Sequence, residues 1–115
     1  RSMGVLEGMS GEDYLAFIQA GGHSRVSYRP EGGESLDDVQ SRVLEFVRRL
    51  GSRHAQQTVL IMTHGGVIAS IISGLFSTSL EEARQRPMDN AALSEILIGP
   101  GQPLVNFFNC VKHLG

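Results

Sequence analysis

The sequence predicts an α/β fold, in which helices cover the faces of a sheet. The short apolar run Thr58–Met62, rich in β-branched residues, indicates a strand that is buried on both faces. Apolar residues recur at helical spacing both before and after this run. Two more strand-like segments follow, joined by a turn rich in glycine and proline. Helix, strand, helix and then two strands is the order expected when helices pack on a sheet.

Composition limits the class of protein. The chain has 115 residues, 41% of them hydrophobic, which predicts a single domain over residues 1–115 with one core. The net charge of −2 provides no basic field for nucleic acid or an anionic membrane surface, although a local cationic pocket for a small anion is compatible with it. Cys110 is the only cysteine, so no internal disulfide forms. With no signal peptide and no apolar run long enough to span a bilayer, we expect a cytoplasmic protein.

Serine residues mark the starts of the predicted helices. Ser10 is placed to cap a short helix over Glu12–Ala20. Ser35 begins the clearest helix, which has acidic residues in its first turn, an apolar stripe that reaches Leu50, and Gly51 as its expected end. The remaining predicted elements are the helices Val67–Leu75 and Leu80–Gln85 and the strands Ala92–Ile98 and Leu104–Val111.

The candidate site lies directly after the predicted strand. His64, Gly65 and Gly66 stand between this strand and the next helix, and open α/β sheets bind ligands at the carboxyl ends of their strands. Glycines let the backbone approach a ligand, and the start of a helix offers unpaired N–H groups to an anion. An imidazole beside such donors can stabilise a phosphoryl group. The residues alone leave a second interpretation open, in which His64 only packs or hydrogen-bonds at a strand end.

Four stretches, in this order and spacing, carry a family resemblance. The segment Val59–Ile68 resembles the second-histidine motif of the histidine phosphatase (phosphoglycerate-mutase-like) superfamily. Residues 1–8 resemble the stretch after that family's catalytic acid, and residues 30–35 resemble the segment upstream of the second histidine. Residues 88–94 resemble the Asn-containing turn before the last strands. The resemblance covers nearly the whole chain.

The resemblance implies part of a phosphoglycerate-mutase-like three-layer sandwich, with helices flanking a mostly parallel sheet and the N-terminal part of the fold absent. It implies phosphoryl transfer without metal or cofactor, in which a first histidine in an Arg-His-Gly motif becomes phosphohistidine and a carboxylic acid protonates the leaving oxygen. By resemblance His64 is the second catalytic histidine, Gly65 offers its N–H to the phosphate, and Arg1 contacts the substrate. A phosphomonoesterase acting on small phosphorylated metabolites is favoured over a mutase.

No segment of the chain matches the nucleophile motif. Arg53-His54-Ala55 lacks the glycine and precedes the predicted strand, so we expect a solvated loop there. We therefore expect the chain alone to be inactive, and to pair with a second copy or with a complementary N-terminal segment. The alternative is a catalytically inactive, truncated or degenerate form that binds a phosphate ligand or a protein. A generic nucleotide-binding module is disfavoured because GxGxxG and Walker A patterns are both absent.

Overall fold

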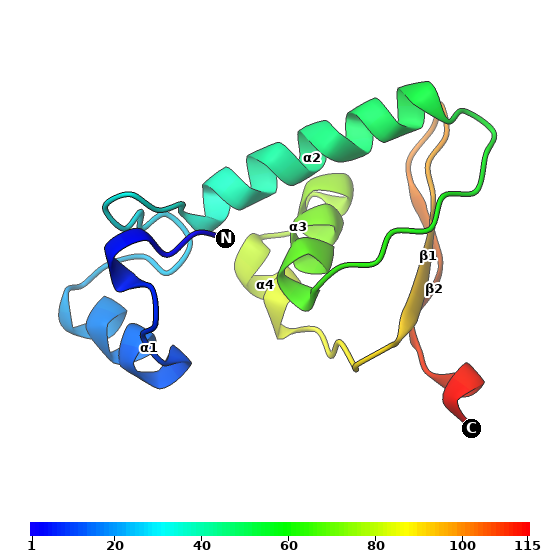
Figure 1. Cartoon of the computed structure of the whole chain (residues 1–115). Coiled ribbons are helices and arrows are strands. Elements are labelled where there is room, and N and C mark those ends of the chain that lie inside the picture. The colour runs from blue at the N-terminus through cyan, green and yellow to red at the C-terminus, as the bar shows by residue number, and fades with distance from the viewer.

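The computed structural model describes all 115 residues as a set of helices and one small sheet. In Figure 1 the long helix α2 runs beside α3 and α4, while α1 and the hairpin lie toward opposite ends of the molecule. In chain order the elements are η1 (Gly4–Leu6), α1 (Gly11–Ala20), α2 (Leu36–Arg53), α3 (Gly65–Phe76), α4 (Leu80–Gln85), β1 (Leu93–Leu97), β2 (Leu104–Cys110) and η2 (Lys112–Leu114). None of the helices combines the length and the apolar composition that a membrane crossing requires.

The predicted serine caps are confirmed. The Ser10 hydroxyl accepts a hydrogen bond from the Asp13 N–H at 3.1 Å, at the start of α1. At the start of α2 the Ser35 hydroxyl accepts from the Asp38 N–H at 3.0 Å, and the Asp38 carboxylate accepts from the Ser35 N–H at 2.8 Å. This reciprocal arrangement is a capping box, which satisfies two backbone donors at once.

The predicted end of α2 is wrong. The helix continues through Gly51 to Arg53, and the His54 N–H still donates to the Leu50 carbonyl at 2.9 Å. A glycine inside a helix costs only about 1 kcal/mol relative to alanine, so a long amphipathic helix can run through it.

The core is thin and lies between the three later helices. Its buried residues come from the start of α2 and from α3 and α4: Leu36, Ala69, Ile72, Leu80 and Ala83. Ile96 of β1 and Phe108 of β2 are partly buried against the same cluster, so the hairpin is attached to it. Only 14 of 115 residues are buried, and the radius of gyration is 15.8 Å, against roughly 13 Å for a compact domain of this length. The chain therefore has an open shape with much apolar surface exposed.

The predicted strand Thr58–Met62 is not a strand in the structure. After a turn at residues 54–56, residues 57–64 form an extended connection to α3 that pairs with no strand, as the green segment in Figure 1 shows. The side chains of Leu60 and Met62 are 82% and 94% exposed. A strand needs a neighbour to satisfy its backbone groups, and the chain supplies none beside this segment.

The α/β class itself is confirmed, but its sheet consists of the C-terminal hairpin alone. β1 and β2 pair antiparallel, with Leu93 opposite Cys110 and Leu97 opposite Leu104. Both strands lie within the ranges predicted for them, and the turn rich in glycine and proline joins them as expected. The mostly parallel sheet implied by the family resemblance is therefore absent from the described chain, because residues 58–62 join no sheet.

Candidate active site

His64 occupies the N-cap position of α3. Its backbone is extended, and its carbonyl accepts from the N–H groups of Val67 at 2.9 Å and Ile68 at 3.1 Å, which starts the helix two residues earlier than predicted. The imidazole is exposed and makes no hydrogen bond within the chain. The side chain therefore serves neither the core nor the helix cap, and it is free to contact a ligand at this helix start.

The first turn of α3 begins with two glycines, so no side chain of its own covers the backbone there. A Cβ added at Gly65 would lie 3.2 Å from the Met88 sulfur, and one added at Gly66 would lie 3.4 Å from Nη1 of Arg84. No acidic residue occupies this turn. The unpaired N–H groups and the positive end of the helix dipole therefore keep their attraction for an anion.

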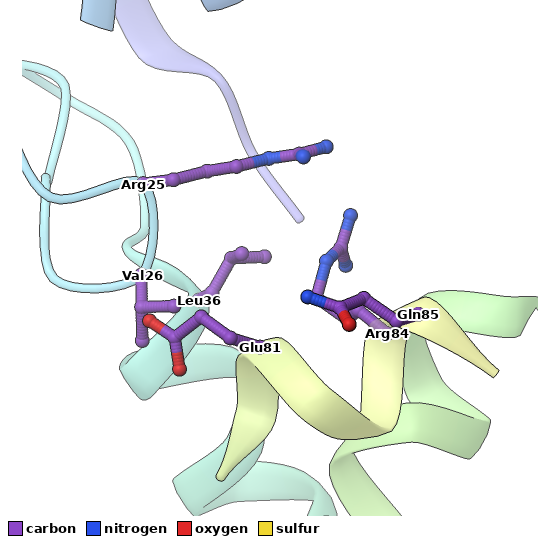
Figure 2. Close-up of a pocket in the computed structure, with 6 residues that line it drawn as sticks. All are labelled: Arg25, Val26, Leu36, Glu81, Arg84 and Gln85. Atoms are coloured by element: carbon purple, nitrogen blue, oxygen red, sulfur yellow. The ribbon is translucent and has the colours of Figure 1, made fainter. Parts of the chain in front are cut away.

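A pocket next to this turn is lined by two arginines, Arg84 and Arg25, which were not among the candidate residues of the sequence analysis. Arg84 comes from α4 and Arg25 from the loop after α1, and in Figure 2 their guanidinium ends extend toward the same space. The pocket has a volume of about 190 Å³ and is lined by Arg25, Val26, Leu36, Glu81, Arg84 and Gln85. Glu81 forms no ion pair with either arginine, and in Figure 2 its carboxylate points away from their guanidinium groups.

Arg84 is a half-buried cation without a counter-ion. Its side chain forms no hydrogen bond or salt bridge. The pKa of its guanidinium is lowered, first because burial removes water and then because the positive charges of Arg25 and Arg1 lie nearby. An anion placed among these groups would offset both effects. A helical-wheel argument would have found the residue, because Arg84 lies one turn after the buried Leu80 and so faces inward.

Arg1 is held within the N-terminal loops. Its Nε donates to the Glu34 carbonyl at 2.8 Å and its Nη2 to the Tyr14 hydroxyl at 2.9 Å, with a longer bond to the Tyr28 carbonyl at 3.4 Å. The Glu34 carboxylate accepts from Arg42 and from the Ser2 N–H, and these bonds lower its pKa. These contacts fasten the N-terminal segment to the loop that precedes α2, while the charge of Arg1 still acts on Arg84.

The other histidines lie apart from the first turn of α3. His54 is exposed at the end of α2, where its Nδ1 is 2.9 Å from the Gln57 side-chain oxygen. His23 stacks on Tyr28 with ring centroids 4.5 Å apart. No cluster of three or more His, Cys, Asp or Glu side chains that could hold a metal ion is present.

Comparison with known proteins identifies the family. Residues 1–111 match the histidine phosphatase superfamily (branch 1). The chain belongs to this superfamily. It is 31% identical over 85 residues to phosphoserine phosphatase 1 of Hydrogenobacter thermophilus, covering 74% of this chain and 40% of that protein. It is 32% identical over 90 residues to 2,3-bisphosphoglycerate-dependent phosphoglycerate mutase 1 of Gloeobacter violaceus, covering 76% and 34%.

The fold agrees with that of a solved bacterial protein. The structure of Bacillus stearothermophilus YhfR superimposes with a TM-score of 0.79 at 30% identity, over 99% of this chain and 59% of that one. The phosphoglycerate-mutase-like fold expected from the sequence is confirmed by this similarity. The chain spans less than half the length of the two curated relatives named above and about three fifths of YhfR.

Proposed function

We propose that this chain carries the second-histidine half of the active site of a phosphomonoesterase that acts through a phosphohistidine intermediate. The observation that carries the proposal is the first turn of α3, where an imidazole without a hydrogen-bond partner in the chain, two glycines and the Arg84 guanidinium surround backbone N–H groups with no acidic side chain among them. This arrangement can hold the oxygens of a phosphoryl group and neutralise charge on them as it is transferred.

The proposed reaction also needs a nucleophilic histidine and a carboxylic acid. The Arg-His-Gly motif that would carry the nucleophile is not among these 115 residues. The nucleophilic imidazole attacks phosphorus, a P–N bond forms and the ester P–O bond breaks, and the acid gives its proton to the leaving oxygen. Water then attacks phosphorus and gives a proton to the carboxylate left by the first step, and the P–N bond breaks to release inorganic phosphate and the free imidazole. His64 and the Gly65 N–H hold the phosphoryl oxygens in both steps.

The substrates we propose are small phosphate esters. Two named relatives are a phosphoserine phosphatase and a phosphoglycerate mutase, and the compounds in these names are three-carbon phosphate esters that also carry a carboxylate. We place this protein on the phosphatase side, with transfer of the phosphoryl group to water.

Rapid mixing of the native protein with phosphoserine tests the proposal. We expect a burst of alcohol release that matches the enzyme concentration, and protein-bound phosphate that survives alkali but is lost in mild acid, as expected of phosphohistidine. The second candidate is a non-catalytic form that binds a phosphate ligand. Phosphoserine binding with neither turnover nor trapped phosphate would support that second candidate and overturn the enzymatic proposal.

A further inference from the structure

The start of α3 lacks the local contacts that order the other helix starts. The cap residue His64 makes no side-chain hydrogen bond, and Gly65 and Gly66 begin the first turn. Glycine is a poor helix former, so this turn frays easily when it is left to itself. The serine caps and acidic residues that hold α1, α2 and α4 have no counterpart here. Contacts from other parts of the chain must therefore keep the turn helical.

Met88 supplies such a contact at the first residue of the helix. Its side chain lies against Gly65, since a Cβ added to this glycine would be 3.2 Å from the Met88 sulfur and 3.7 Å from the Met88 Cβ. Met88 also packs against the core cluster. It belongs to the connection between α4 and β1, outside any helix or strand. The place of its side chain therefore depends on what fixes this connection.

The next residue, Asp89, is fastened to β2 by the side chain of Asn109. The Asp89 N–H donates to Oδ1 of Asn109 at 2.8 Å, and Nδ2 of Asn109 donates to the Asp89 carboxylate at 2.8 Å. These two hydrogen bonds form the Asn109–Asp89 clamp. The Asn109 N–H donates to the Ser94 hydroxyl of β1 at 3.0 Å. Asn109 therefore ties the connection that carries Met88 to both strands of the hairpin.

Asn109 has a backbone conformation that is unusual within a strand. Its φ is +53°, in the left-handed region that Asn and Asp tolerate better than most other residues with a side chain. The pairing of β1 with β2 is irregular here, because the register shifts between Leu93 and Glu95. A left-handed residue costs free energy and persists where its surroundings fix it, often in support of a functional site. The only hydrogen bonds of the Asn109 amide are those of the clamp.

We propose that Asn109 is a positioning residue for the reaction, which acts through Asp89 to hold Met88 against the first turn of α3. This inference rests on the proposed function, in which the Gly65 N–H binds phosphoryl oxygens. A turn that is ordered before the substrate arrives loses less conformational entropy on binding, and its donors stay aimed at the transferring group. Asn109 itself contacts no substrate in this role.

A reciprocal exchange of the two clamp residues tests the proposal. Asn109→Asp keeps the tolerance for a left-handed backbone but sets two carboxylates against each other. Adding Asp89→Asn restores the pair, because the new amide at position 89 can donate to the carboxylate at position 109. Asn106→Asp is the matched control, since Asn106 donates to the Glu95 carboxylate in the same way on the same two strands, away from the connection to α4.

Amide hydrogen exchange in the native protein reports on the first turn, because the N–H groups of Val67 and Ile68 donate to the His64 carbonyl. For Asn109→Asp we expect these two amides to exchange at least about fivefold faster, while the later turns of α3 keep their wild-type rates. The kcat/KM for phosphoserine should fall by a similar factor. The reciprocal double variant should recover both quantities, and Asn106→Asp should change neither.

A double-mutant cycle tests whether Met88 transmits the effect. Met88→Ala alone should speed exchange in the first turn, because the contact with Gly65 is lost. In that background Asn109→Asp should change the exchange rates by less than about twofold, since the clamp then has no side chain to hold in place. Effects of the two substitutions that simply multiply would show that Asn109 does not act through Met88, and would contradict the proposal.

The other outcomes decide as follows. Faster exchange throughout α3, or an equal response in Asn106→Asp, would mean a general loss of stability and overturn the positioning role. Unchanged exchange at Val67 and Ile68, or faster exchange with full turnover, would overturn it as well.

If the wild type does not hydrolyse phosphoserine, the proposed function fails, and the affinity for inorganic phosphate, followed by the amide resonances of Gly65 and Gly66, replaces turnover. A loss of at least about fivefold in Asn109→Asp that the double variant recovers would support the positioning role, and equal affinities would reject it.

Discussion

The N-terminus of α2 and the N-terminus of α3 both leave backbone N–H groups without helical partners, but different groups surround them. At α2, Ser35 and Asp38 form a capping box, and the Arg29 side chain pairs with the Asp38 carboxylate. At α3, His64 stands in the cap position without a side-chain hydrogen bond, and two glycines replace the acidic first turn. α1 and α4 resemble α2, since each has a serine cap and acidic residues.

The comparison separates a helix start that stabilises the fold from one that is open to a ligand. At α1, α2 and α4 a serine hydroxyl accepts from a first-turn N–H and acidic residues offset the helix dipole, so these starts attract an external anion less. The start of α3 keeps its positive potential, and the unpaired Arg84 beside it increases that potential. An open, positively charged helix start costs some stability in the free protein, and a bound phosphoryl group would offset that cost.

The largest expected effect belongs to His64. His64→Ala should lower kcat in the native protein by about a hundred- to a thousandfold, because one preorganised donor to the transferring group is lost. Steady-state hydrolysis of phosphoserine measures it. His54→Ala is the matched control, since His54 is an exposed histidine whose ring contacts only Gln57, and its turnover should equal that of the wild type. Unchanged turnover in His64→Ala would remove His64 from the site.

A second variant converts the start of α3 into one like those of the other helices. Gly66→Asp places a carboxylate in the first turn, close to Arg84, because a Cβ at this position lies 3.4 Å from Nη1. We expect kcat/KM to fall at least tenfold, about 1.4 kcal/mol, while Tm stays equal or rises as the new carboxylate pairs with the arginine. Gly66→Asn has nearly the same shape without the charge and should lose much less activity. Identical losses in both variants would show that shape rather than charge matters here.

The opposite change, at α2, should affect stability alone. Ser35→Ala removes the cap hydroxyl that accepts from the Asp38 N–H, which should cost about 1 kcal/mol of unfolding free energy. Urea denaturation measures this loss, and kcat should not change. Ser41→Ala is the control within the same helix, since the exposed Ser41 hydroxyl bonds only to the Asp37 carbonyl of the preceding turn. A loss of activity in Ser35→Ala without loss of stability would contradict the distinction between the two helix starts.

The smallest effect is the dependence of the α2 cap on pH. Hydrogen bonds from the Ser35 N–H and hydroxyl, followed by the nearby Arg29 charge, hold the pKa of the Asp38 carboxyl below its ordinary value. A lowered folded-state pKa stabilises the fold fully above the unfolded value of about 3.9, and this contribution disappears as the pH falls through the folded-state pKa. The Tm difference between wild type and Asp38→Asn should therefore be constant near neutrality and shrink below about pH 4.

Asp37→Asn is the control for this titration, because Asp37 lies in the same first turn and its carboxylate makes no hydrogen bond within the chain. Scanning calorimetry from pH 7 to pH 3 would record all three proteins. A wild-type minus Asp38→Asn difference that does not vary with pH would show that the carboxylate charge contributes nothing to the cap.

How much of the structure is predictable depends on how local its cause is. The serine caps at Ser10 and Ser35 could be predicted from the sequence because each depends on residues within one turn. The position of His64 before a helix could be predicted for the same reason. Whether Thr58–Met62 forms a strand could not be predicted from the sequence, because an apolar, β-branched run becomes a strand only beside another strand.

The sequence by itself determined the four main helices, the two paired strands and the placement of His64, Gly65 and Gly66 at a helix start, because propensity, capping and apolar periodicity act over a few residues. Only the tertiary structure decided that Arg84 and Arg25 line one pocket beside that helix start, although they are 59 positions apart in the sequence. It also decided that Arg1 contacts Tyr14 of α1 and Glu34 of the loop before α2. Packing between distant segments sets these neighbours, and it also places the Arg84 charge beside Gly66 in the first turn of α3.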